Sequence, residues 1–142
     1  MAQKPFNKFN NFVLALAQGK HDLTTAQLKV ALCNSLNEPN TDAAKLADLV
    51  EINYTYLSSR DLTVTDAGQV DGLFTLAVDD LTITATVPLN EVTQGFQYVV
   101  VYNDSATDKD LIGWFARDAD ITLEDGDEVQ VIHNASGLLT LQ

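Results

Sequence analysis

The chain has 142 residues, enough for one domain with a substantial core. Its hydrophobic fraction of 46% and charged fraction of 20% are typical of a folded globular protein rather than a disordered one. Twenty acidic residues against eight basic ones give a formal charge of −12, which repels nucleic acid, and no apolar run approaches the roughly 20 residues of a membrane helix. We therefore expect a single domain over residues 1–142 that binds neither nucleic acid nor membrane.

The first segment predicts an amphipathic helix over residues 5–18. Four apolar residues recur at spacings of three and four and would form one stripe: Phe6, Phe9, Val13 and Leu16. Phe12 broadens this apolar face. Pro5 suits the first turn of a helix, and Gly19 suits its C-terminal stop. No small-residue cleavage site follows the short apolar stretch, so we do not expect a signal peptide.

The same segment is also the candidate for contact with a partner. The first twenty residues contain no acidic residue, although the chain as a whole is strongly acidic. Terminal amphipathic segments either pack on the sheet of their own domain or dock on a neighbouring subunit, and residues 1–19 could do either. The residues that we expect at a partner interface are the cationic and aromatic ones: Lys4, Phe6, Lys8, Phe9 and Phe12.

The residues after Gly19 predict one strand and one short helix. Leu28, Val30 and Leu32 alternate with Lys29 and Ala31, the period of two that a strand with one buried face shows. Residues 34–41 contain a proline and predict a loop. Residues 42–50 can form a short helix, with a threonine or an aspartate available as N-cap.

From residue 62 onward the hydrophobic pattern keeps a period near two. The predicted strands cover residues 62–64, 73–78, 81–87, 96–102, 111–116, 121–123, 129–133 and 138–141. Turn signals stand between them, at 66–68, 71–72 and 79–80. Residues 96–102 are apolar on both faces, which indicates a central strand. Short strands closed by turns predict a mainly β chain: an antiparallel β-sandwich or jelly-roll-like domain with an N-terminal helix and one short additional helix.

The sequence contains no constellation that catalysis needs. No serine lies in a G-x-S-x-G elbow, and no glycine-rich loop precedes a helix. We expect the two histidines, His21 and His133, at the surface, and one cysteine with two separate histidines cannot build a zinc site. Cys33 is expected to be buried, and a single unpaired cysteine suits a protein made in a cytosol. We therefore predict a protein that is not an enzyme and binds no cofactor.

Carboxylates and tyrosines are the remaining candidates for ligand binding. The carboxylates near the C-terminus lack the spacing of a calcium loop, so we expect them to face solvent: Asp118, Asp120, Glu124, Asp125, Asp127 and Glu128. Gly126 between two apolar runs predicts a tight hairpin with a positive φ. Trp114 is expected in the core. A sugar-binding surface would need exposed aromatics, for which only Tyr54, Tyr56 and Tyr98 are candidates.

Several short motifs resemble a family of small virion proteins of tailed bacteriophages. The motifs are F-N-x-F, L-A-x-G-x-H-x-L, L-K-V-A-L-C-N-S, V-V-Y-N-D-S, L-I-G-W-F and I-T-L-x-D-G-D. In this sequence the matching residues are Phe6, Asn7, Phe9, Leu16, Ala17, Gly19, His21, Leu23 and the segments 28–34, 102–104, 111–114 and 121–126. The resemblance covers both ends of the chain and leaves residues 36–95 largely unmatched.

The resemblance implies a structural part of a virion, in the first place a capsid decoration or cement protein. Such a protein would be made in the host cytoplasm and would bind the outer surface of the head. Its partners would be the major capsid protein and neighbouring copies of itself in a homo-trimer or dimer. The charge of −12 agrees with an outward position, away from the packaged genome. The alternative is a tail- or fibre-associated structural or receptor-binding module.

Overall fold

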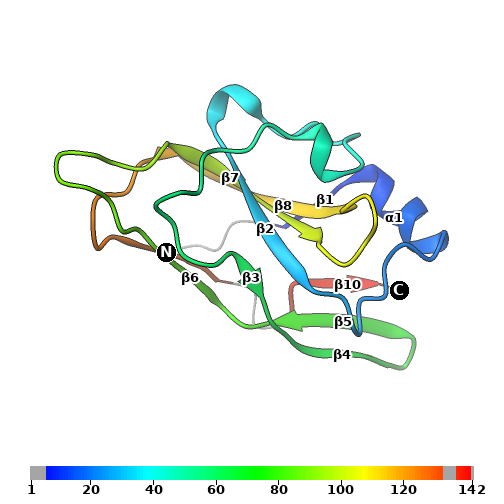
Figure 1. The fold of residues 1–142 in the computed structure, drawn as a ribbon. Coiled ribbons are helices and arrows are strands. Elements are labelled where there is room, and N and C mark those ends of the chain that lie inside the picture. Colours follow the sequence, from blue (N-terminus) through cyan, green and yellow to red (C-terminus); the bar gives the residue numbers. More distant parts are fainter. Residues whose placement is uncertain (1–5, 133–136, 142) are drawn as a thin grey trace.

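A computed structural model describes residues 6–132 and 137–141 of the chain, and it is mainly β with antiparallel strands in a sandwich-like arrangement (Figure 1). The strands are β1 Asn7–Lys8, β2 Leu28–Cys33, β3 Asp61–Leu62, β4 Val64–Val70, β5 Leu73–Val78, β6 Leu81–Thr84, β7 Phe96–Asn103, β8 Leu111–Ile121, β9 Glu128–Val131 and β10 Leu139–Leu141. One α-helix, α1, covers Asn10–Ala17, and 3₁₀ turns cover Ser35–Asn37 and Leu46–Asp48. The predicted fold class is confirmed.

The larger layer is a five-stranded sheet in the order β1-β8-β7-β2-β3. β7 lies at its centre, as the apolar residues on both of its faces predict, and all of its residues except Gln97 are buried. β2 pairs with β7 along its whole length, from Leu28 opposite Asn103 to Cys33 opposite Tyr98. The sheet therefore joins segments from the two ends of the chain.

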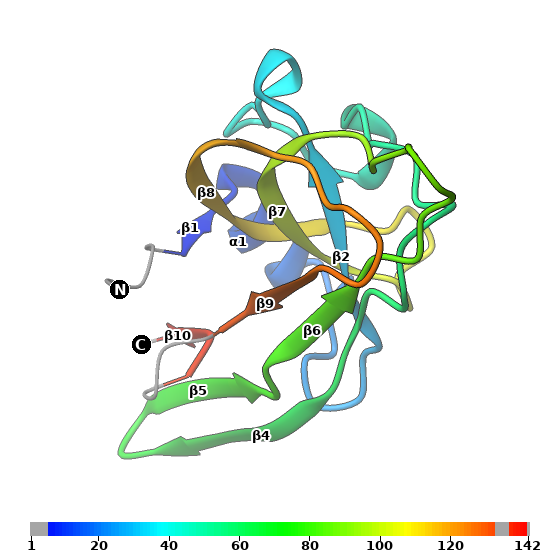
Figure 2. The ribbon, with the colours of Figure 1, turned by 90° about the vertical axis from the view of Figure 1, so that its left-hand side faces the viewer.

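The second layer consists of a three-stranded sheet, β10-β5-β4, and the two-stranded sheet β6-β9. Figures 1 and 2 show these strands below β2, β7 and β8. The space between the layers is filled by aliphatic and aromatic side chains. The largest fully buried ones there are Phe12, Leu28, Leu32, Leu62, Leu76, Ile83, Phe96 and Ile112.

The outer face of the large sheet is also covered. A second buried cluster lies on this face and includes Phe9, Ala31, Cys33, Val100 and Trp114. The cover comes from the connection after β2, through three side chains: Ala43, Leu46 and Leu49. Both faces of the central strands are therefore largely buried, which the sequence predicted for β7 but not for β2, where the alternation indicated one buried face.

The N-terminal helix differs from the prediction in length and in orientation. It begins at Asn10 because residues 7–8 form β1, which pairs with the edge of β8. Its buried residues are Phe12 and Ala15, whereas Val13, expected in the apolar stripe, is 63% exposed. Gly19 ends the segment with a φ of 76°, as expected.

Four further expectations are corrected. Residues 42–50 contain only the 3₁₀ turn Leu46–Asp48 in place of a helix. The turn expected at 66–68 lies inside β4, and the chain reverses instead at Asp71-Gly72. The strands expected at 111–116 and 121–123 are one strand, β8, which ends at Ile121. β9 pairs with β6 rather than with β8, so the Gly126 segment crosses between sheets and does not close a hairpin.

Candidate partner-binding surfaces

The aromatic residues of the N-terminal segment pack inside their own chain. The Phe6 ring lies 5.0 Å from the Phe115 ring, measured between centroids, and the Phe9 ring lies 4.6 Å from that of Trp114. Phe12 is fully buried, and its ring centroid is 5.3 Å from that of His21. Phe9 and Phe12 therefore contribute to the core, and neither offers a free surface to a partner.

A glycine in β8 lets the N-terminal segment lie against the sheet. β1 pairs Asn7 with Trp114 and Lys8 with Gly113. A Cβ at Gly113 would overlap the Asn7 carbonyl oxygen and the Phe6 ring. Any larger residue at position 113 would have to displace the strand, so Gly113 determines where the N-terminal segment docks.

The exposed part of the N-terminal segment is different from the part that the sequence suggested. Val13 is 63% exposed and Leu14 is 53% exposed, both on the outer side of α1. Lys8 is exposed beside them in sequence. Lys4, also expected at a partner interface, lies outside the described residues. Lys8, Val13 and Leu14 are thus the cationic and large apolar residues that this segment exposes, and Lys8 is the one among them that the sequence suggested.

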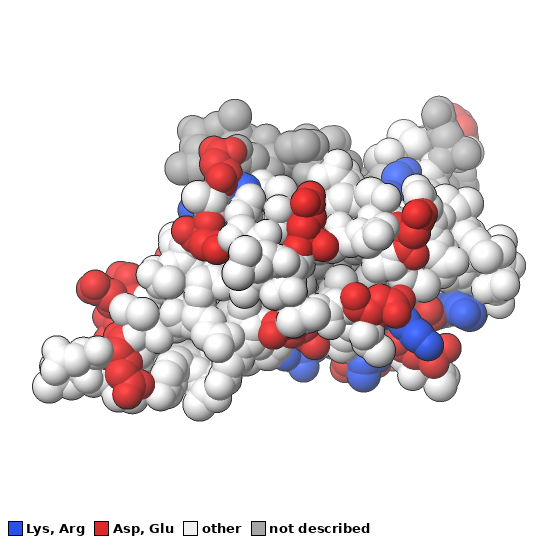
Figure 3. Space-filling model, turned by 90° about the horizontal axis from the view of Figure 1, so that it is seen from above, with Lys and Arg blue, Asp and Glu red and all other residues white. Residues whose placement is uncertain are grey.

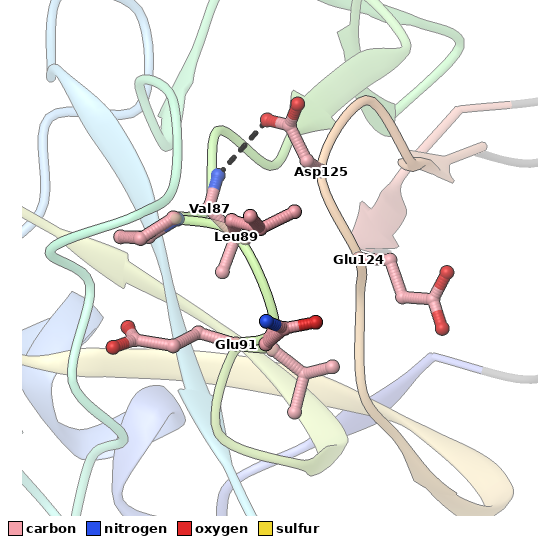
Figure 4. A pocket seen from close by; sticks show the side chains of 8 residues that line it. Val87, Leu89, Glu91, Glu124 and Asp125 are labelled. Atoms are coloured by element: carbon pink, nitrogen blue, oxygen red, sulfur yellow. Dashed lines mark hydrogen bonds between the residues drawn. The ribbon is translucent and has the colours of Figure 1, made fainter.

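A hollow of about 520 Å³ lies at the end of the sandwich, between residues 87–92 and the turn at 124–125 (Figure 4). Its apolar members include Leu89, which is 91% exposed, and Val92, which is 48% exposed. Asp125 Oδ1 accepts a hydrogen bond from the Val87 amide at 3.0 Å and so holds the two segments together. Glu91 and Glu124 give the hollow a negative potential, and no cation lines it among the described residues.

The acidic character extends over the surface. Figure 3, the view from above, shows acidic side chains in separate groups across this face, with fewer basic ones between them. Such a distribution suits a partner with basic groups.

His21 is buried, contrary to the expectation of a surface residue. It is 6% exposed, and its Nδ1 lies 3.1 Å from Nδ2 of Asn103. The Asn103 side chain donates a hydrogen bond to His21 through Nδ2 and accepts one from the Ser105 amide through Oδ1. Burial lowers the pKa of His21, Asp110 partly opposes this effect, and Lys20 adds to it. The cluster fastens the segment after α1 to the end of β7 and to the β7–β8 connection.

The carboxylates near the C-terminus support turns. Asp120 accepts two hydrogen bonds from Ser35, one from its amide at 2.8 Å and one from its hydroxyl at 2.7 Å. Asp127 Oδ2 accepts from the Glu124 amide at 2.9 Å. The four acids around Gly126 are exposed, as predicted. Across residues 6–132 and 137–141, no three His, Cys, Asp or Glu side chains are placed to hold a metal ion.

The three tyrosines do not form a sugar-stacking surface. Tyr54 accepts a hydrogen bond from the Leu32 amide and donates one to Glu51, while the Arg60 guanidinium lies 3.6 Å from the centre of its ring. Tyr98 is 7% exposed. Tyr54 and Tyr56 lie in a connection outside the strands, where neither residue is fully exposed.

The remaining single residues have the places expected of them where the structure describes them. Cys33 is buried, and burial raises its thiol pKa to about 11. Trp114 is 9% exposed and belongs to the core. His133 lies outside the described residues. No helix in the described part of the chain is long and apolar enough to cross a membrane.

Comparison with known proteins adds no family: no family model, curated protein or solved structure matches the chain. Interaction surfaces are therefore inferred from the exposure, charge and geometry of the chain's own residues.

Sequence periodicity missed the exposed apolar loop residues Leu36 and Leu89, which are 90% and 91% exposed, because isolated apolar residues in loops carry no periodic signal. Pro39, three residues after Leu36, marked only the first of these segments as a loop.

Proposed function

We propose that this chain is a structural virion protein of a tailed bacteriophage, a capsid decoration or cement protein that binds the outer surface of the head. One observation carries the proposal. Motifs that resemble the phage family come from both ends of the sequence, and they meet in one part of the fold. Phe9 from the first motif packs on Trp114 from the fifth at 4.6 Å.

The second, third and fourth motifs also contact one another. His21 contacts Asn103 at 3.1 Å, and β2 pairs with β7 along six positions. If the matched residues maintain one structural unit of the family, contacts of this kind are expected among them. This clustering supports the family resemblance, and through it the role on a virion.

The surface chemistry supports a role in assembly. The exposed apolar residues of α1 and of the hollow lie outside the core, where a partner can cover them. The negative charge keeps the free protein soluble and would favour a partner surface with basic groups. We propose the major capsid protein as the main partner, with neighbouring copies of the chain at the same symmetry positions.

Binding to purified heads and tails tests the proposal. We expect the protein to co-sediment with DNA-filled heads at hundreds of copies per particle, as symmetry positions on a shell require. Binding to tails at a few copies would instead identify the tail- or fibre-associated alternative. Binding to neither particle would contradict both.

Surface variants then locate the contact. Leu14→Asp and Leu89→Asp each place a charge on a residue that is already exposed, at 53% and 91%, so both should fold. Loss of head binding in Leu14→Asp alone would identify the N-terminal surface Lys8, Val13 and Leu14. Loss in Leu89→Asp alone would identify the hollow between residues 87–92 and 124–125.

A further inference from the structure

β4 is the longest of the strands that lie at the edge of a sheet among the described residues. It spans seven residues at the end of the order β10-β5-β4, whereas the edge strands β1, β3 and β10 have two, two and three, and β6 and β9 have four each. A free edge presents a row of backbone donors and acceptors that another strand can use. Figures 1 and 2 show the β4–β5 hairpin projecting from the lower layer.

Two other edges of the described sheets carry features that oppose pairing, and in β4 such features are confined to its first three residues. Residues 117–120 of β8 bulge away from β7 and contain Arg117 and two aspartates. β3 carries Asp61 in an ion pair with Lys29 at 3.8 Å. β4 has one charged residue, Asp66, and neither lysine nor proline. Its own irregularity lies between Val64 and Asp66, so residues 66–70 continue regularly.

The register of the hairpin shows which backbone groups are free. Val70 and Leu73 close a two-residue turn at Asp71-Gly72, whose φ values are 53° and 84°. These two residues form a hydrogen-bonded pair, and such pairs alternate along an antiparallel ladder. The N–H and C=O groups of Ala67 and Gln69 therefore point away from β5, toward the outer edge.

We propose that β4 pairs with β4 of a second copy, antiparallel, about a two-fold axis at Gly68. In this register Ala67 of one copy faces Gln69 of the other, and their outward N–H and C=O groups form two hydrogen-bonded pairs. Gly68 faces Gly68 of the second copy, where the absence of side chains allows close approach. Asp66 faces Val70, so no two acids are opposed. The result is a continuous six-stranded sheet.

The pairing is weak by itself and does not depend on the proposed virion role. An edge contact of five residues buries less than the roughly 1,200–2,000 Å² of stable complexes, so dimers form at high protein concentration or when a larger assembly brings copies together. Each copy has a formal net charge of −12, so the two copies repel each other. Added salt screens this repulsion and should therefore strengthen the association.

Cysteine cross-linking tests the register. Gly68→Cys places two thiols opposite each other at the axis, and its new Cβ has open space, since the nearest atom, Asp66 Oδ1, is 3.9 Å away. We expect disulfide-linked dimer under mild oxidation. In Val70→Cys the two thiols lie about 13 Å apart along the strand, four residues at ~3.3 Å each, so that control should stay monomeric. Cys33 is buried and does not compete.

A charge variant provides the second measurement. Gly68→Glu opposes two carboxylates at the axis and should abolish dimer in sedimentation at high protein concentration, whereas the charge-matched surface variant Gln130→Glu should leave it unchanged. Thermal melts check that each variant folds. Equal cross-linking of Gly68→Cys and Val70→Cys, or a purely monomeric wild-type chain that Gly68→Cys fails to cross-link, would overturn the proposal.

Discussion

The side-chain amide of Asn103 lies 3.1 Å from Nδ1 of His21 and joins residues that are 82 positions apart in the chain. Because the amide nitrogen donates, this nitrogen of the imidazole accepts and carries no proton. A second proton on the ring would bring two donors face to face. Asn103 cannot simply reverse its amide, since its oxygen accepts from the Ser105 amide at 2.9 Å. The contact is therefore compatible with a neutral histidine only.

The pH dependence of stability follows from this contact. Burial lowers the pKa of His21 below its ordinary value of 6.5, so the unfolded chain binds more protons than the folded one below that pH. Stability is full above pH 6.5 and falls as the pH drops below it, by no more than about 1.4 kcal/mol per pH unit for one proton. Thermal melts between pH 7.5 and about 5 should show this loss, and a His21→Gln variant should show less of it. Equal slopes would contradict the assignment.

Gly126→Ala should destabilise the protein by about 1 kcal/mol or more, because φ at this position is 86° and a Cβ there is strained. The new methyl group meets no atom within 4 Å, so the cost comes from the backbone alone. Gly68→Ala is the matched control, since it adds the same methyl group in open space without a positive φ. Urea unfolding should separate the two variants.

Asp127→Asn should cost much less than Gly126→Ala. The Asp127 side chain accepts one hydrogen bond from the Glu124 amide, and an asparagine oxygen can accept the same bond. The side chain is exposed, so loss of its charge has little effect on the free energy of unfolding. A harmless Gly126→Ala together with a damaging Asp127→Asn would mean that the carboxylates hold a cation or a partner.

Gly113→Ala should displace the N-terminal segment from β8, because the added Cβ overlaps the Asn7 carbonyl and the Phe6 ring. We expect a loss of about 1–3 kcal/mol, as for other overpacked sites, and a change in Trp114 fluorescence. Phe6→Ala removes part of the overlap, so the double variant should lose less than the sum of the single losses. Strict additivity would show that Phe6 does not contact position 113.

Phe12→Ala and Val13→Ala distinguish the two faces of α1. Phe12 is fully buried, and its truncation should cost about 3–5 kcal/mol. Val13 is 63% exposed, and its truncation should change stability by no more than about 0.5 kcal/mol. Denaturant unfolding of both variants measures the difference. Similar losses would favour the helical stripe that the sequence spacing indicated.

The sequence predicted the features of the fold that depend on local pattern and burial. Apolar residues on both faces identified β7 as a central strand, and Asp71-Gly72 identified a two-residue turn. Pairing across sheets was not predictable in the same way. Nothing in the segment after Ile121 indicates that β9 pairs with β6 rather than with β8, because either pairing would bury the same alternating residues of β9.

The N-terminal helix was predicted correctly, but its start and its buried face differ from the prediction for a tertiary reason. Phe6 and Phe9 have the spacing of a helical stripe, but Phe9 packs on Trp114 and residues 7–8 gain backbone pairing with β8. These contacts come from residues more than one hundred positions away, so they leave no signal near Phe6. For the same reason the exposed apolar residues of this segment are Val13 and Leu14, and not the phenylalanines that the sequence suggested.

The register between β2 and β7 has a kinetic consequence. Leu28 pairs with Asn103, and Cys33 pairs with Tyr98, so the most buried ladder closes a loop that contains β3, β4, β5 and β6. Closing a loop of that length costs entropy before any of the buried contacts form. The β4–β5 hairpin, which needs only a two-residue turn, should gain protection from amide exchange first during refolding, and β2 should gain it late.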